Sequence, residues 1–107
     1  MDAPVVLPPR SSDYAARLPA SLAELHGPAN GRMELPLHVA WSGRRVYDLD
    51  DDRQRLLLYA LLLAEAPAAD LPRLVNAELL RRLWPDLRRL LGPARRRAWE
   101  TLLSAAA

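Results

Sequence analysis

Residues 51–67 read DDRQRLLLYALLLAEAP, and this stretch decides the fold. Asp50 or Asp51 can cap a helix from Asp52 to about Ala66, and acidic residues at a helix N-terminus suit the helix dipole. The run from Leu56 to Ala64 is apolar all round, which predicts a central helix that is covered on most sides. Pro67 ends the helix because it cannot continue the backbone hydrogen bonds.

More helices are expected after it. Asp70 can cap a short helix that has Pro72 in its first turn. Asn76 can cap a longer one with a stripe of apolar side chains at helical spacing. The stripe consists of Leu79, Leu80, Leu83, Trp84, Leu87, Leu90 and Leu91. Pro85 interrupts it, which predicts a kink or two helical pieces, and a last helix is expected from about Pro93 to Ser104.

A β-hairpin is expected before these helices. Apolar side chains alternate over residues 33–39, with Met33, Leu35, Leu37 and Val39 at period two. Pro36 restricts this strand to a sheet edge or a bulge, and Ser42-Gly43 favours a turn before a second strand over residues 44–49. We therefore predict an α+β fold with a hairpin at about 32–49 packed on a mainly helical half, residues 51–104, in a single domain spanning 1–107.

The N-terminal part carries two further signals. Residues 1–11 contain three prolines, which predicts an extended leader. Ser21 and Glu24 form the pattern of a capping box for a helix over residues 22–26. Gly27 would end that helix at the C′ position, with Pro28 beyond it.

Composition excludes several chemistries. All 15 basic residues are Arg, so a lysine nucleophile, a Schiff base and a P-loop are excluded. The absence of Cys excludes disulfides and thiolate zinc sites. The longest apolar run is about half of the ~20 residues that a membrane span needs. We therefore expect a cytoplasmic protein with no membrane contact.

No residue pattern predicts catalysis. Asp48, Asp50, Asp51 and Asp52 could hold a cation, but no Gly or distant Glu completes a calcium loop, and helix capping is favoured. His26 and His38 lack the sequence spacing of a catalytic or metal site. We expect no enzyme activity, no metal and no cofactor.

Arginines are the strongest physical signal. Residues 79–98 hold Arg81, Arg82, Arg88, Arg89, Arg95, Arg96 and Arg97 against one acid, Asp86. The first two pairs lie seven residues apart, so both should face away from the leucine stripe, and the last three should extend that surface. A guanidinium fits phosphate, so nucleic acid, an acidic protein partner and a merely solvated face all remain open.

Two other features bear on binding. Trp41, beside Arg44 and Arg45, could be an exposed interface anchor or a core residue, while the remaining Trp and Tyr side chains are expected mostly in the core. A helix-turn-helix can be drawn over residues 70–91, but its turn lacks Gly and Pro85 falls inside the recognition helix. The leucine-rich half also admits a homodimer.

Several segments together carry a family resemblance over nearly the whole chain. They are LPPR (7–10), AELHGP (23–28), LPLHVAWSG (35–43), YDLD (47–50), LAE (63–65), DL (70–71), LWPDL (83–87) and RRAWE (96–100). With these the chain resembles small actinobacterial proteins that are often labelled transcriptional regulators and are associated with a nucleotidyltransferase toxin of the abortive-infection class. The resemblance implies an antitoxin-like binding protein that neutralises a cognate toxin by direct contact. The alternative is a DNA-binding transcriptional regulator that binds operator DNA.

Overall fold

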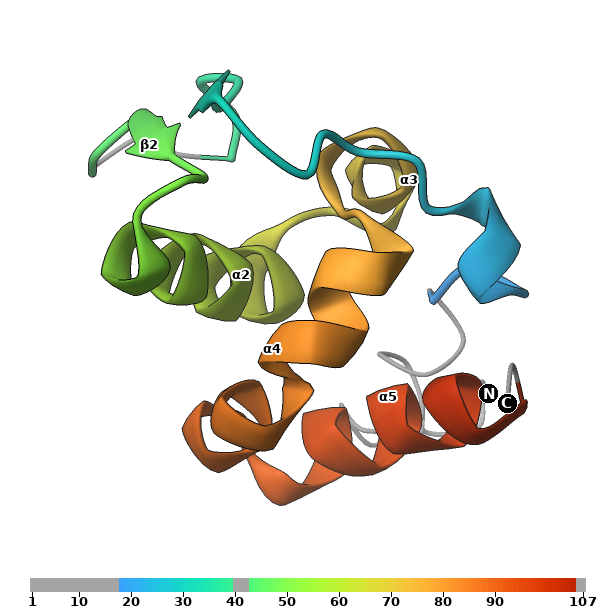
Figure 1. Cartoon of the computed structure of the whole chain (residues 1–107). Coiled ribbons are helices and arrows are strands. Elements are labelled where there is room, and N and C mark those ends of the chain that lie inside the picture. Colours follow the sequence, from blue (N-terminus) through green and yellow to red (C-terminus); the bar gives the residue numbers. More distant parts are fainter. Residues whose placement is uncertain (1–17, 40–42, 106–107) are drawn as a thin grey trace, which may run out of the picture.

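The computed structural model describes residues 18–39 and 43–105, and it has the predicted α+β architecture. A two-stranded antiparallel hairpin is followed by four α-helices packed together (Figure 1). The elements are η1 (Leu22–Glu24), β1 (Arg32–Glu34), β2 (Val46–Asp48), α2 (Asp52–Glu65), η2 (Ala68–Asp70), α3 (Leu71–Leu74), α4 (Ala77–Leu90) and α5 (Pro93–Ala105). Helix α2 packs against both β2 and α4, and α5 lies at the other end of α4 from α3 (Figure 1).

The hairpin is shorter than the alternating pattern predicts. Met33 pairs with Tyr47, and both side chains are buried while Glu34 and Val46 beside them are exposed. The first strand ends before Pro36, whose carbonyl accepts a bond from the Val39 N–H at 3.0 Å and closes a turn. The prediction of a strand through residue 39 is therefore wrong, because Pro36 cannot donate to the ladder. The turn leaves Leu37 63% exposed.

Helix α2 begins where the capping pattern predicts. The Asp51 carboxylate accepts the Gln54 N–H at 2.9 Å. One side of the helix, with Leu58, Tyr59, Leu62 and Leu63, is buried in the core. The expectation that α2 is covered on most sides is wrong at Leu57, which is 50% exposed.

Helix α4 is a single continuous element. Asn76 caps it, with its side-chain oxygen 2.9 Å from the Leu79 nitrogen. The helix continues through Pro85 without the break that the sequence left open. Burial of the leucine stripe offsets the hydrogen bond that a proline removes. The buried residues of the stripe are Leu79, Leu80, Leu83, Leu87 and Leu91, whereas Trp84 is half-buried and Leu90 is exposed.

The segment before the hairpin crosses the junction between α3 and α4. The capping box of Ser21 forms as predicted, but the helix is one 3₁₀ turn that ends at Glu24. Gly27 is therefore not a helix C′ residue, and its φ lies outside the positive region. It is a glycine because a Cβ would lie 2.5 Å from the carbonyl carbon of Leu74.

Asn76 joins three parts of the chain at this crossing. Its backbone N–H donates to the Tyr59 hydroxyl at 2.9 Å, and its side-chain amide donates to the Gly27 carbonyl at 3.0 Å. Burial raises the pKa of Tyr59 to about 12, against the smaller lowering effect of the Asn76 bond. These contacts hold the start of α4 under the N-terminal segment.

Two further expectations concern the chain ends and the membrane. The predicted leader at residues 1–11 lies outside the described residues. None of the helices in the described part of the chain is long and apolar enough to cross a bilayer.

Candidate binding surface

The four arginines of α4 are all exposed, as predicted, but they lie on two different flanks. Residues seven apart lie on the same side of a helix. Arg81 and Arg88 therefore share the side of α4 next to α5, and Arg82 and Arg89 share the side toward α2. The sequence predicted one basic face on α4, but the four arginines form two pairs on different sides of the helix.

Arg88 forms an ion pair between two helices of the fold. Its Nε donates to Glu100 Oε2 of α5 at 3.0 Å, and Trp84 Nε1 lies 3.4 Å from the same oxygen. The bond from Arg88 is the largest cause that holds the pKa of Glu100 below its usual value, with Arg96 contributing by charge. Arg88 is exposed, as predicted, and it also ties α4 to α5 through Glu100.

The arginines of α5 are also divided. Arg97 is exposed, whereas Arg95 and Arg96 are half-buried. Arg95 lies one turn before the fully buried Trp99, and Arg96 lies one turn before Glu100. The prediction that all three extend one basic surface is therefore wrong for Arg95 and Arg96.

A shallow hollow of about 510 Å³ between α2 and α4 adds two arginines that the sequence did not indicate, Arg53 and Arg55. Arg53 of α2 and Arg82 of α4 both line it, beside Asp52 and Asp86. Asp52 already pairs with Arg55. Arg53 was missed because the first turn of α2 meets α4 only through tertiary packing.

The second predicted group consists of Trp41, Arg44 and Arg45. Trp41 lies outside the described residues. Arg45 pairs with Glu34 at 3.1 Å across the hairpin. The Arg44 guanidinium carbon lies 5.7 Å from the centre of the Tyr47 ring, which is cation–π distance.

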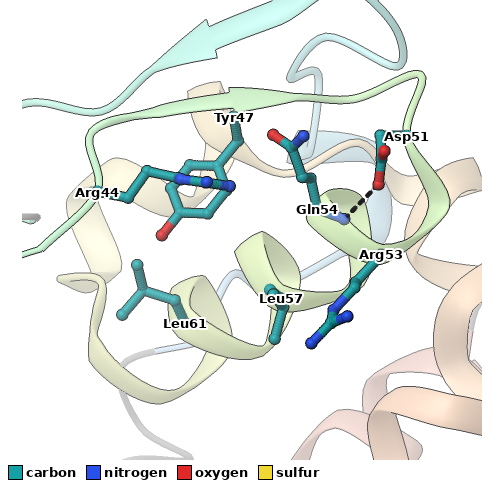
Figure 2. Close-up of a pocket in the computed structure, with 7 residues that line it drawn as sticks. All are labelled: Arg44, Tyr47, Asp51, Arg53, Gln54, Leu57 and Leu61. Atoms are coloured by element: carbon teal, nitrogen blue, oxygen red, sulfur yellow. Dashed lines mark hydrogen bonds between the residues drawn. The ribbon is translucent and has the colours of Figure 1, made fainter.

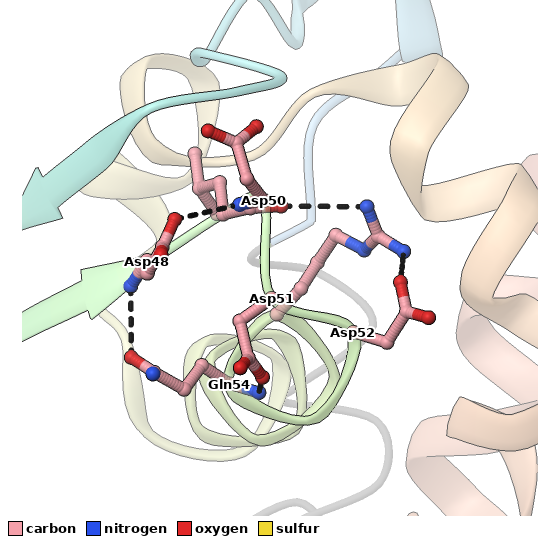
Figure 3. A network of polar contacts seen from close by, with 7 residues as sticks. Asp48, Asp50, Asp51, Asp52 and Gln54 are labelled. Carbon is pink, nitrogen blue, oxygen red and sulfur yellow. Dashed lines mark hydrogen bonds and ion pairs between the residues drawn. The ribbon is translucent and has the colours of Figure 1, made fainter.

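The acidic cluster at residues 48–52 is a set of separate hydrogen bonds (Figure 3). Asp51 caps α2, Asp48 accepts the Asp50 N–H at 2.9 Å, and Asp50 accepts the Gly31 N–H at 3.3 Å. The prediction that this cluster caps a helix is confirmed for Asp51. No set of three metal-binding side chains is found among the described residues.

One histidine has a partner that no sequence spacing revealed. His38 Nε2 lies 2.7 Å from Oδ2 of the buried Asp70, which also pairs with Arg73. Burial raises the pKa of Asp70, but the bonds from His38 and Arg73 outweigh it and hold the pKa below its ordinary value. Asp70 therefore does not cap α3 as predicted, and it ties the turn after β1 to that helix instead. His26 is exposed and forms a backbone bridge with Asn76.

The comparisons with known proteins add no relative. No family model matches the chain, and no curated protein or solved structure is significantly similar to it.

Proposed function

We propose that this chain is an antitoxin-like binding protein that neutralises a cognate nucleotidyltransferase toxin by direct contact. The observation that carries the proposal is the flank formed by Arg82 and Arg89, which are exposed and make no ion pair within the described residues. Arg53 extends this flank across the α2–α4 hollow. The family resemblance supports the choice of partner.

The chemistry of this flank suits an acidic protein surface. Arg82 and Arg89 are seven residues apart on one helix, which separates their Cα atoms by about 10 Å along the axis. Because the helix is rigid, the two guanidinium groups are held at a set spacing and can each bind a carboxylate through two parallel bonds. They would compete for the acidic metal- or nucleotide-binding pocket of the toxin, or cover its tRNA surface.

The test is co-purification of the full chain with the product of the neighbouring gene. We expect the two proteins to associate and the chain to rescue growth of cells that express the toxin. Replacing Arg89→Glu should weaken association at least about tenfold, which corresponds to about 1.4 kcal/mol. The control is Arg32→Glu, the same charge reversal at an exposed position on β1.

Two results would overturn the proposal. One is failure of the unmodified chain to bind the neighbouring protein or to rescue growth. The other is equal loss of binding in Arg89→Glu and Arg32→Glu, which would show that only net charge matters.

The alternative is a DNA-binding regulator, favoured by the same exposed arginines because guanidinium groups also bind phosphates. The start of α4 is bonded to Gly27 and Tyr59, which leaves it poorly placed to enter a groove as a recognition helix. A mobility-shift titration with the upstream promoter fragment distinguishes the two functions. Duplex binding that weakens steeply with salt supports the regulator, and no binding at tens of micromolar protein removes it.

A further inference from the structure

A second hollow lies on the other side of α2, between that helix and β2 (Figure 2). Its volume is about 650 Å³, within the range of about 300–1,000 Å³ that is usual for ligand clefts. Tyr47, Leu57 and Leu61 supply its apolar lining. Leu57 and Leu61 are one helical turn apart, so their side chains lie on the same side of α2 beneath the tyrosine ring (Figure 2).

The charges around this hollow are mainly cationic. Arg44 lies against the Tyr47 ring, and Arg53 is exposed at the other end of the hollow (Figure 2). Asp51 is the single acid in the lining, and its carboxylate is occupied by the Gln54 N–H. Neither Arg44 nor Arg53 forms an ion pair within the part of the chain that the structure describes.

We propose that this hollow binds an acidic amphipathic segment of a partner protein. A large apolar side chain of the segment packs on Tyr47 and Leu57, and its carboxylates pair with Arg44 and Arg53. A half-exposed leucine beside a tyrosine and two arginines that form no ion pair among the described residues is the composition that interface centres favour. A second copy of this chain fits less well, because a twofold contact would place each cationic rim against itself.

This inference does not depend on the proposed toxin contact. Arg82 and Arg89 of α4 carry that function, and neither lines the hollow between β2 and α2. Arg53 lines both hollows, but the variants Leu57→Ser and Arg89→Glu leave it unchanged, so loss of binding at one surface can be measured with the other intact.

The test is an NMR titration of the ¹⁵N-labelled full chain with a synthetic amphipathic peptide of about 14 residues, in which leucines at helical spacing are separated by glutamates. We expect saturable shifts centred on the amides of Tyr47, Leu57 and Leu61. A matched peptide with lysine in place of every glutamate should bind at least about tenfold more weakly.

Two variants locate the contact. Leu57→Ser should weaken peptide binding at least about tenfold and should still fold, because Leu57 is 50% exposed. Leu90→Ser is the matched control, since Leu90 is 55% exposed on α4 and outside the hollow.

The proposal is overturned by shifts that fall elsewhere, by equal affinity for the two peptides, or by equal effects of the two variants. It is also overturned if the hollow amides shift with protein concentration alone, which would identify a second copy as the occupant.

Discussion

The crossing at Gly27 makes a sharp prediction for the variant Gly27→Ala. A Cβ at this position would lie 2.5 Å from the Leu74 carbonyl carbon, 2.7 Å from the Leu74 oxygen and 2.7 Å from the Val75 nitrogen. All three are backbone atoms, so no side-chain rotation relieves the overlap. The segment would have to move away from α3, which strains the bond from the Gly27 N–H to the Val75 carbonyl, now 2.9 Å long.

The size of the effect follows from these two costs. Overpacking of a tight contact costs about 1–3 kcal/mol. Weakening a buried hydrogen bond adds about 0.5–1.5 kcal/mol. We therefore expect the free energy of unfolding to fall by about 2–4 kcal/mol. For a domain of this size, each kcal/mol lowers the melting temperature by about 4–8 °C, so the loss should be at least about 8 °C.

The assay is thermal and urea unfolding followed by circular dichroism, with Gly43→Ala as the matched control. Among the described residues, and apart from its chain neighbours, no atom lies within 4 Å of a Cβ added at Gly43, and its φ is not positive. The control should stay within about 1 kcal/mol of the unmodified chain. A Gly27→Ala variant as stable as this control would refute the close crossing of the two segments.

Three other stability predictions follow from single contacts. Tyr59→Phe removes the acceptor of a buried backbone N–H and should cost about 1–3 kcal/mol in urea unfolding. Asp70 has a lowered pKa when folded, so its ionised form stabilises the fold above pH ~4 and this contribution is lost as the pH falls through the folded pKa. The stability difference from Asp70→Asn should thus be larger at neutral pH than at about pH 3, and a constant difference would contradict it. Arg88→Glu places a carboxylate beside Glu100 and should destabilise the fold more than Arg89→Glu, which should change the free energy of unfolding by no more than about 0.5 kcal/mol in the same assay.

The helix starts were predictable from sequence. Ser21, Asp51 and Asn76 each cap the helix or turn that was expected to follow them. A cap joins a side chain to a backbone N–H two or three residues later, so the interaction is contained in a short window of sequence. The bounds of α2 and α5 agree with the predictions to within one residue at each end.

Other predictions were wrong because they considered only neighbouring residues, whereas a contact or turn elsewhere in the chain decided the structure. Asp70 stands at the position of an N-cap, yet its carboxylate is hydrogen-bonded to His38 from the turn after β1 instead of to the helix backbone. Leu37 continues an alternation that the backbone no longer follows after Pro36. Both errors come from contacts or turns that the residue pattern alone does not specify.

The candidate binding surface was also predictable only in part. The sequence by itself determined that α4 buries its leucines and exposes four arginines, because helical periodicity follows from hydrogen bonds four residues apart. Only the tertiary structure decided that Arg88 forms an ion pair with Glu100, twelve residues away. It also decided that Arg53 of α2 joins Arg82 across a shared hollow. Such pairings depend on how the helices pack, and packing is set by the whole core rather than by any single stretch of sequence.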